Sequence, residues 1–300
     1  MPEQQHGLLV LDKPKGPSST RCLEKIKWAL KQKKIGHAGT LDPMATGVLL
    51  VLLGHGTKVA QYLLDGDKTY QGLLTLGRAT DTYDAEGVVV SEAPWEHLDP
   101  EVIRSEVMAW RELTEQEVPP YSAAKHNGQP LYKLSREGRE TPVKIKTIHI
   151  SAVEILAWDL PRIRFRVTCG AGTYIRSLAH SLGMRLGCGA VLEELIRERS
   201  HPFGLDQAHS LDTVLAEPDS LAQRVLPLAT ALPHWPHLEL SEPQAKLVRN
   251  GGQIEYVPEP GQGIHAPGTR AMLTAHGEPL ALVELRIRHG IPVWAILRGL

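Results

Sequence analysis

One short stretch of the chain holds a carboxylate in surroundings that could make it reactive. Residues 36–47 read Gly-His-Ala-Gly-Thr-Leu-Asp-Pro-Met-Ala-Thr-Gly and run directly into an apolar segment. The glycines permit backbone angles that other residues avoid, and Pro43 keeps Asp42 out of the helical region. The Asp42 carboxylate is therefore held at a defined place, where it could act as a nucleophile. An Asp before a proline is also a common turn residue, so the loop alone leaves both roles open.

The whole string resembles the signature of the tRNA pseudouridine synthases of the TruB family. The match runs over Gly-His-Ala-Gly-Thr-Leu-Asp-Pro-x-Ala-Thr-Gly, which is far longer than a lone glycine-rich motif. The resemblance implies that Asp42 is the catalytic nucleophile. It also implies that His37 helps to handle a target nucleotide that has been flipped out of the RNA.

Two further segments agree with the family pattern and follow in family order. Lys68-Thr69-Tyr70 opens an alternating strand, and residues 172–178 read Gly-Thr-Tyr-Ile-Arg-Ser-Leu. The resemblance makes Tyr70 the residue that packs on the target base, and Arg176 the ion-pair partner of Asp42. It places Lys68 and Tyr174 in contact with the substrate. This pairing is physically sound, because a carboxylate removed from water stays ionised only beside a positive charge.

Residues 118–138 are too long and too polar to be a simple connection. Lys125, His126 and Arg136 are interleaved with tyrosines, a combination that suits phosphate contact and base stacking. The segment resembles the insertion with which the TruB family grips RNA. We therefore expect these three basic residues to bind the substrate.

The charges of the chain are segregated although its net charge is only −1. Residues 21–40 carry six basic residues against one acid, and residues 161–192 carry five arginines and no acid. Residues 81–117, in contrast, hold eleven acids. Because local basic surfaces rather than net charge attract phosphates, the first two segments are candidates for RNA contact, with a solvated charged face as the alternative.

Composition and motifs exclude several other classes of protein. No apolar run could span a membrane, and the first residues have neither the basic region nor the apolar stretch of a signal peptide, so we expect a cytoplasmic protein. Cys22, Cys169 and Cys188 are odd in number and widely spaced, which suggests buried thiols rather than disulfides. No metal-binding or dinucleotide-binding motif is present, and residues 77–87 lack the spacing of a calcium loop, so we expect neither metal nor cofactor.

The hydrophobic pattern predicts the main elements. We expect strands at 7–12, 48–53, 68–77, 88–90, 143–156 and 162–169, with three arginines of the last on one face. We expect helices from Ser18 or Ser19, over 57–64, from Asp99, over 211–215 and over 242–248. In the helix from Asp99, the apolar face should hold Val102, Ile103, Val107 and Trp110. Short strands should follow around the turn at 276–279 and at 292–297.

The predicted fold class is α+β. A catalytic domain over 1–233 would have a large mixed sheet with flanking helices, and residues 234–300 would form a small β-rich domain similar to a PUA-type RNA-binding module. The TruB resemblance covers roughly residues 7–205.

That resemblance implies isomerisation of a uridine in the T-arm of tRNA, position 55, to pseudouridine by a monomer that needs no protein partner. Two alternatives remain. One is a guide-RNA-dependent synthase of the dyskerin kind, and the other is a non-catalytic RNA binder. The insertion argues against the first, and the set of Asp42, Tyr70 and Arg176 argues against the second.

Overall fold

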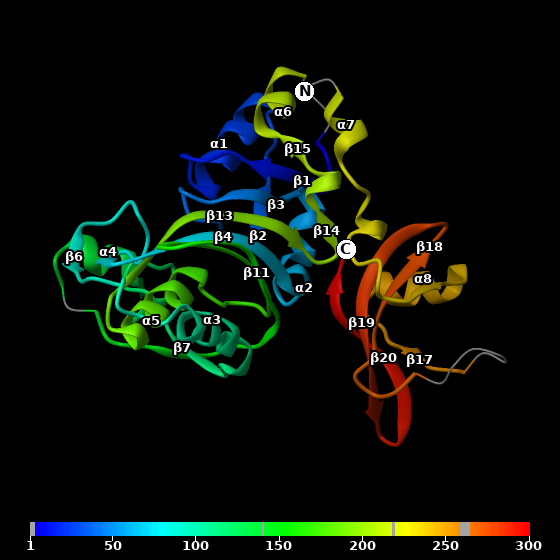
Figure 1. The fold of residues 1–300 in the computed structure, drawn as a ribbon. Coiled ribbons are helices and arrows are strands. Elements are labelled where there is room, and N and C mark those ends of the chain that lie inside the picture. The colour runs from blue at the N-terminus through cyan, green and yellow to red at the C-terminus, as the bar shows by residue number, and fades with distance from the viewer. Residues whose placement is uncertain (1–3, 140, 218–219, 259–264) are drawn as a thin grey trace.

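A computed structural model describes residues 4–139, 141–217, 220–258 and 265–300. A large mixed β-sheet with helices packed on it forms the main body, and a second, β-rich part follows towards the C-terminus (Figure 1). The predicted α+β fold class is therefore confirmed. None of the helices in the described residues is long and apolar enough to cross a membrane.

Within the described residues, nine strands build the large sheet. Its main path runs β11-β12-β4-β13-β3-β1-β15, while β2 pairs with β3 and β14 with β13. The strands are β1 (Gly7–Lys13), β2 (Ile35–Ala38), β3 (Thr46–Leu53), β4 (Lys68–Leu76), β11 (Ile150–Asp159), β12 (Arg162–Cys169), β13 (Ala190–Ser200), β14 (Phe203–Gly204) and β15 (His209–Ser210). β13 runs parallel to β3 and antiparallel to β4, so it joins the two halves of the sheet.

Both faces of the sheet are covered, which explains why residues 48–53 show no alternation. Alternate residues of β3 enter two different cores: Leu49 and Val51 lie in the first, and Leu50 and Leu52 in the second. The first core also takes residues from α1, α3, α5 and α6, and the second takes residues from α2. The helices are α1 (Ser19–Ala29), α2 (Ala60–Leu64), α3 (Pro100–Met108), α4 (Leu131–Arg136), α5 (Ile175–Leu186), α6 (Leu211–Ala216) and α7 (Leu221–Arg224).

The C-terminal part has its own sheet in the order β16-β18-β19-β20-β17. Its elements are β16 (His237–Glu239), α8 (Glu242–Arg249), β17 (Ile254–Glu255), β18 (Arg270–Ala275), β19 (Glu278–Arg288) and β20 (Ile291–Gly299). It has a core of its own, yet Met272 and Leu282 belong to the core on the second face of the large sheet. This small sheet therefore packs directly on the large one.

Among the residues that the structure describes, three short strand pairs lie outside both sheets. They are β5 (Arg78–Thr80) with β6 (Val89–Glu92), β7 (Glu115–Glu117) with β10 (Ile145–Thr147), and β8 (Lys125–His126) with β9 (Gln129–Pro130). The last pair and α4 form the insertion at 118–138. Leu131 and Leu134 of α4 are buried, so the insertion is folded rather than a loose connection.

One prediction is refined by the structure and another is wrong. Residues 57–64 are helical as predicted, but they comprise the end of a 3-10 helix over Gly54–Val59 and the short α2, and the Thr57 hydroxyl donates to the Gly54 carbonyl at 2.9 Å. Val102 does not lie on the apolar face of α3 and is 51% exposed. Ile103 and Val107 define that face at the i, i+4 spacing, which turns Val102 towards solvent.

Candidate active site

One pocket brings the three sequence motifs together. Its volume is about 380 Å³, within the range typical of small-ligand sites. The loop 39–42, the start of β4, the segment 170–176 and β13 all contribute to its wall. Of the residues predicted for the site, the wall includes Asp42, Lys68, Tyr70, Tyr174 and Arg176.

Asp42 and Arg176 form an ion pair inside this pocket. The Arg176 Nε lies 2.9 Å from Asp42 Oδ2, and its Nη2 donates to Asp42 Oδ1 at 3.3 Å. Arg176 is buried in the first turn of α5, while the Asp42 side chain is 37% exposed. The guanidinium therefore holds the carboxylate at two points and leaves it accessible from the pocket.

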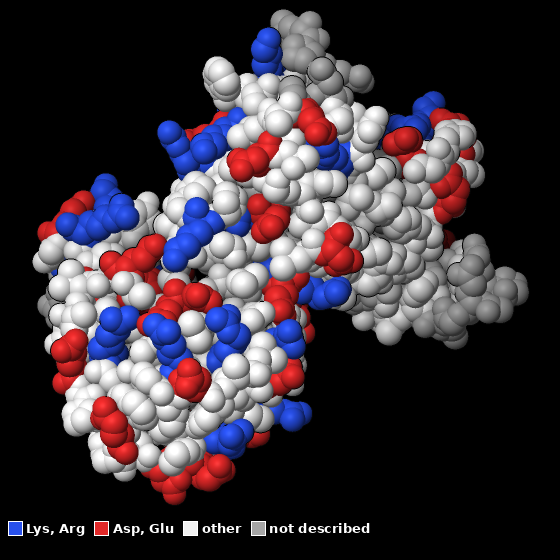
Figure 2. All heavy atoms as spheres, turned by 45° about the horizontal axis from the view of Figure 1, so that its top comes forward, with Lys and Arg blue, Asp and Glu red and all other residues white. Residues whose placement is uncertain are grey.

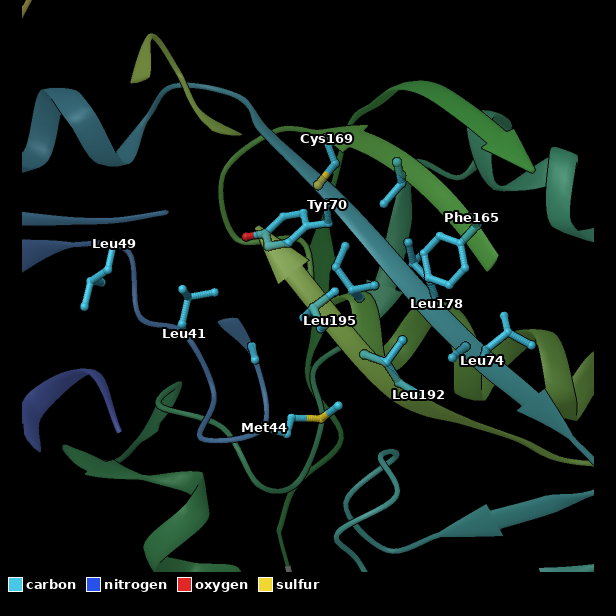
Figure 3. Packing of buried hydrophobic residues seen from close by; sticks show 14 of the residues in the cluster. Leu41, Met44, Leu49, Tyr70, Leu74, Phe165, Cys169, Leu178, Leu192 and Leu195 are labelled. Atoms are coloured by element: carbon cyan, nitrogen blue, oxygen red, sulfur yellow. The ribbon is translucent and has the colours of Figure 1, made fainter. Parts of the chain in front are cut away.

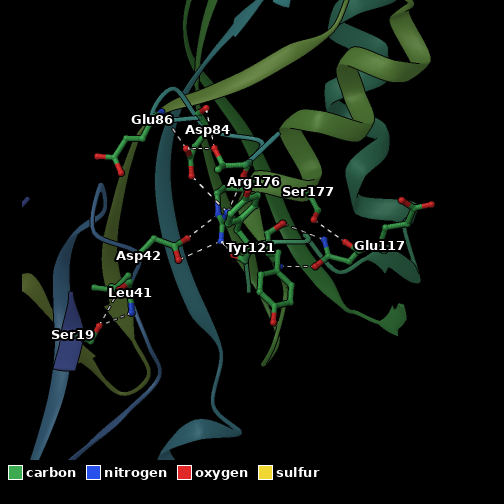
Figure 4. Close-up of polar contacts among 12 residues, drawn as sticks. Ser19, Leu41, Asp42, Asp84, Glu86, Glu117, Tyr121, Arg176 and Ser177 are labelled. Carbon is green, nitrogen blue, oxygen red and sulfur yellow. Dashed lines mark hydrogen bonds and ion pairs between the residues drawn. The ribbon is translucent and has the colours of Figure 1, made fainter. Parts of the chain in front are cut away.

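Arg176 is itself fixed by groups from two other segments. It donates to the Thr82 carbonyl at 2.8 Å and to the Tyr121 carbonyl at 2.9 Å, and it lies 3.6 Å from a carboxylate oxygen of Asp84. Figure 4 shows Arg176 between Asp42 and Asp84. The side chain is thus oriented from several directions, which leaves Asp42 little freedom to move relative to it.

Asp84 also organises the acidic loop in which it lies. One of its carboxylate oxygens accepts from the Thr82 hydroxyl at 2.6 Å and from the Glu86 N–H at 3.1 Å. Asp81 likewise accepts within the loop, from the Val88 N–H at 2.8 Å. The contact between Asp84 and Arg176 was not predicted, since nothing local in the sequence connects this loop to α5.

Two buried residues of the N-terminal segment, Lys13 and Ser19, hold the backbone of the Asp42 loop. The Lys13 ammonium donates to the Ala45 carbonyl at 2.8 Å and to the Pro43 carbonyl at 3.4 Å. The Ser19 hydroxyl donates to the Leu41 carbonyl at 2.9 Å and accepts from the Leu41 N–H at 2.8 Å. Burial lowers the pKa of Lys13. These bonds fix the backbone on both sides of Asp42.

Arg197 of β13 links the same loop to Tyr70. It is only 1% exposed, and it donates to the Val48 carbonyl at 2.6 Å and to the Gly39 carbonyl at 2.9 Å. In the pairing of β13 with β4, Arg197 lies opposite Tyr70, and in the pairing with β3 it lies opposite Gly47. One buried guanidinium therefore connects both ends of the Asp42 loop with the strand that carries Tyr70.

The glycines of the loop make this close approach possible. A Cβ on Gly47 would lie 2.3 Å from the Arg197 carbonyl oxygen, and a Cβ on Gly39 would lie 3.3 Å from the Arg197 guanidinium. Both glycines have φ above +90°, a conformation that side chains disfavour. Position 47 therefore requires glycine, because the Arg197 backbone leaves no room for a Cβ and because the backbone angle disfavours a side chain.

The Tyr70 ring is part of the first core and also lines the pocket. Figure 3 shows it beside Cys169 with its hydroxyl turned away from the apolar side chains around Leu178. Burial raises the pKa of Tyr70, and the nearby charge of Arg197 offsets this only in part. The phenol is therefore protonated at neutral pH and presents a flat apolar surface to the pocket.

Lys68 and Tyr174 line the same pocket, and other protein groups bond the Lys68 ammonium and the Tyr174 backbone. The Lys68 ammonium donates to the carbonyls of Leu64 and Gly66, and burial lowers its pKa to about 8. The backbone N–H and carbonyl of Tyr174 are both bonded by the Gln116 amide, which fixes the residue before α5. Burial raises the pKa of Tyr174 as well.

The other predicted substrate-binding residues lie outside this pocket. His37 lies on β2, and burial, with a smaller effect of the Arg197 charge, lowers its pKa. Lys125 and His126 form β8, and Arg136 ends α4 with its guanidinium 5.6 Å from the Tyr132 ring centre. The structure therefore brings Lys68 and Tyr174 together with the groups predicted for chemistry. It places His37, Lys125, His126 and Arg136 outside the pocket wall.

Lys13 and Arg197 are the residues that sequence reasoning missed. A signal was present in both cases, because each shares a strand face with buried apolar residues two positions apart: Lys13 follows Leu9 and Leu11, and Arg197 follows Leu195. A charged residue in an apolar phase is either paired or functional. Both are bonded to the loop that carries Asp42.

The arginine-rich segment 162–185, a candidate for RNA contact, forms ion pairs within the protein. Its arginines pair with acids from neighbouring elements, and on the face drawn in Figure 2 basic and acidic side chains are interleaved. The partners are Glu193 for Arg162, Glu194 for Arg164, Glu154 and Glu198 for Arg166, and Glu106 for Arg185. The sequence of the segment does not reveal these acids, because they come from other strands and from α3.

The mixed sheet and its helices have the fold of pseudouridine synthases, and Asp42, Arg176 and Tyr70 line one pocket of it. The archaeal box H/ACA sRNP Nop10-Cbf5 complex superposes with a TM-score of 0.70 and 26% sequence identity, over 98% of this chain and 86% of the other. Among the described residues, no group of three or more His, Cys, Asp or Glu could hold a metal ion.

Sequence comparisons define the family. Residues 27–175 match the TruB family pseudouridylate synthase N-terminal domain, and residues 176–233 match the tRNA pseudouridylate synthase B C-terminal domain. The tRNA pseudouridine synthase B of Nitratidesulfovibrio vulgaris (strain DSM 19637 / Miyazaki F) is 61% identical over 100% of this chain and 98% of its own length. That of Geobacter sulfurreducens is 43% identical over 93% of each. The chain therefore belongs to the TruB family of tRNA pseudouridine synthases, which isomerise uridine to pseudouridine in tRNA.

Proposed function

We propose that the chain isomerises one uridine in the T-arm of tRNA, at position 55, with Asp42 as the nucleophile. The observation that supports this most is the position of the Asp42 carboxylate. It is half-exposed in a pocket, held at two points by Arg176, and shares that pocket with the Tyr70 ring. A carboxylate that served only as a turn residue would not need a buried guanidinium.

The proposed rearrangement needs a nucleophile and a surface on which the extruded base can stack, and Asp42 and Tyr70 are the candidates for these two roles in the pocket. The N1–C1′ bond of the uridine breaks, a C5–C1′ bond forms, the C5 hydrogen leaves as a proton, and N1 ends with a proton. Asp42 can attack the sugar at C1′ or the base at C6, and its position is compatible with both routes. The raised pKa of Tyr70 suits stacking on the extruded base better than accepting the C5 proton.

The remaining predicted residues act on the RNA around this centre. His37 takes part in flipping the nucleotide or filling its place, and Lys68 and Tyr174 contact the bound nucleotide. Lys125, His126 and Arg136 of the insertion grip the RNA outside the pocket. The insertion is also tied to the chemistry, since the carbonyl of its Tyr121 accepts from Arg176.

We further propose a division into a catalytic domain over 1–233 and a PUA-like RNA-binding domain over 234–300, in a monomer that acts without a protein partner. The second sheet and its separate core support this division. The folded insertion at 118–138 supports independent action, because an enzyme without a guide RNA has to grip its substrate itself.

Mapping pseudouridine in an unmodified tRNA transcript treated with the purified chain alone tests this function. We expect one modified site, in the T-arm at position 55, and no product when that uridine is replaced by cytidine. Product only at other uridines would contradict the T-arm assignment. Product only after a guide RNA is added would contradict independent action.

A further inference from the structure

Trp28 stands apart from the other tryptophans of the chain. Its side chain is 85% exposed, whereas Trp110, Trp235 and Trp294 are buried and the remaining two are half-buried. Complete exposure of so large an apolar ring gives no stability to the fold, since the hydrophobic contribution requires burial. The indole is free to contact another molecule.

The phase of α1 places Trp28 among basic residues. Cys22 and Ile26 point into the core, so the opposite side of the helix faces solvent. Arg21, Lys25 and Trp28 follow the i, i+4, i+7 spacing and form one stripe on that side. We call this stripe the α1 face.

The charges around the α1 face favour a polyanion. Lys25, Lys27, Lys31, Lys33 and Lys34 are all exposed. In the part of the chain that the structure describes, none of them makes an ion pair, and Arg21 pairs with Glu24 at 3.4 Å between two exposed side chains. Lysines in such a cluster repel one another and a second copy of the same surface, but they attract RNA phosphates.

The α1 face also lies within reach of an RNA bound in the pocket. α1 begins at Ser19, whose hydroxyl bonds Leu41 beside Asp42. Trp28 is nine residues further along the helix, which corresponds to about 13 Å at 1.5 Å per residue. A tRNA whose uridine occupies the pocket has neighbouring nucleotides at this distance.

We propose that the α1 face is a second tRNA contact, in which an unpaired base stacks on Trp28 while Arg21 and Lys25 contact the adjacent phosphates. An exposed aromatic ring among basic residues is the arrangement that binds single-stranded nucleotides with little dependence on sequence. The inference rests on tRNA as the substrate and adds a contact distant from the catalytic pocket.

The test is the Kd for an unmodified full-length tRNA transcript, measured over a series of salt concentrations. Trp28→Ala should weaken binding at least about fivefold at every salt concentration with an unchanged salt slope, because stacking releases no counterions. Trp28→Phe should recover part of the loss. Lys25→Gln should instead lower the magnitude of the slope of log Kd against log salt by about 0.7 to 0.9.

Val102→Ala provides the matched control. Val102 is an exposed apolar residue on the solvent side of α3, next to Glu101 and Glu106, and its replacement should change neither affinity nor slope. Equal affinity of Trp28→Ala and the parent protein would overturn the proposal. A change of oligomeric state in Trp28→Ala with unchanged tRNA affinity would assign the face to a second copy and would also overturn it. Product mapping with the parent protein tests the proposed function separately.

Discussion

Two basic segments of this enzyme look alike in sequence and differ in structure. The arginines of 162–185 lie on β12 and α5, where Glu194, Glu198 and Glu106 are among the acids that pair with them. The lysines of 25–34 lie on and after α1, exposed and without acidic partners among the described residues. The arginines connect strands and helices of the fold, whereas the lysines leave their charge available to a ligand.

The density of basic residues therefore does not by itself locate an RNA-binding surface. A guanidinium can hold two carboxylates or carbonyls in fixed directions, which suits it to structural pairing, and Arg176 uses the same property to fix Asp42. A lysine on a solvent-exposed helix forms no such fork. Neighbouring carboxylates, which only the fold reveals, decide between structure and binding.

Among the arginine and lysine substitutions, Arg176→Lys is expected to have the largest effect on the single-turnover rate. The substitution keeps the charge but loses the planar fork, so the single-turnover rate should fall about 100-fold or more. The affinity for tRNA should stay within about twofold of the parent value. Arg185→Lys, in the same helix and paired with Glu106, is the control and should keep the parent rate. A near-normal rate for Arg176→Lys would make Arg176 an ordinary structural arginine.

A smaller effect should separate the two segments directly. Replacing Lys25, Lys27 and Lys31 by Gln should weaken tRNA binding about tenfold at physiological salt and reduce the salt slope by about two. The matched replacement of Arg162, Arg164 and Arg166 by Gln should leave the slope unchanged. Titration of both triple variants with the same transcript is the measurement. Equal loss of slope in the two would break the distinction drawn here.

Replacing an arginine of the segment 162–185 is expected to affect stability. Arg166 pairs with Glu154 at 3.0 Å and Glu198 at 2.7 Å, and its side chain is 39% exposed. Solvent screening limits such pairs, so Arg166→Gln should lower the free energy of unfolding by no more than about 1 kcal/mol. Urea unfolding at low and high salt measures this, and the loss should shrink at high salt. A loss in tRNA affinity without loss of stability would instead make Arg166 a binding residue.

The smallest effect concerns pH. Burial lowers the pKa of His37 below its ordinary value of 6.5, so below that pH the unfolded chain binds the proton more readily than the folded one. Stability should therefore fall as pH drops through 6.5, and the stability of His37→Gln should fall less steeply. Urea unfolding at pH 7.5 and 5.5 compares the two. A parallel fall in both proteins would mean that His37 titrates normally.

Local pattern predicted much of the fold. The strand at 48–53, the helix capped by Ser18 and the helix capped by Asp99 all follow from periodicity and capping residues, which act over a few neighbours. Val102 was misplaced because apolar type alone did not fix its phase on α3. The first turn of the 3-10 helix at 54–59 contains a side-chain bond from Thr57 to the Gly54 carbonyl, which periodicity does not detect.

The site was predictable only in part. The pairing of Asp42 with Arg176 came from motif resemblance and is present in the structure. Arg197, Lys13 and Asp84 act through contacts between distant segments, and residue spacing carries no information on such contacts. Lys13 and Arg197 could nevertheless have been noticed in the sequence, since each is a charged residue that shares a strand face with buried apolar residues.

A single-turnover assay of Asp42→Asn with T-arm RNA, with binding measured on the same samples, tests most directly whether Asp42 is the nucleophile. Asn keeps the size of Asp but cannot attack carbon as a carboxylate does. The variant should fold, bind tRNA about as tightly as the parent protein, because affinity comes from phosphate and stacking contacts elsewhere, and form no detectable pseudouridine. Isomerisation near the parent rate would contradict the assignment of Asp42 as the nucleophile.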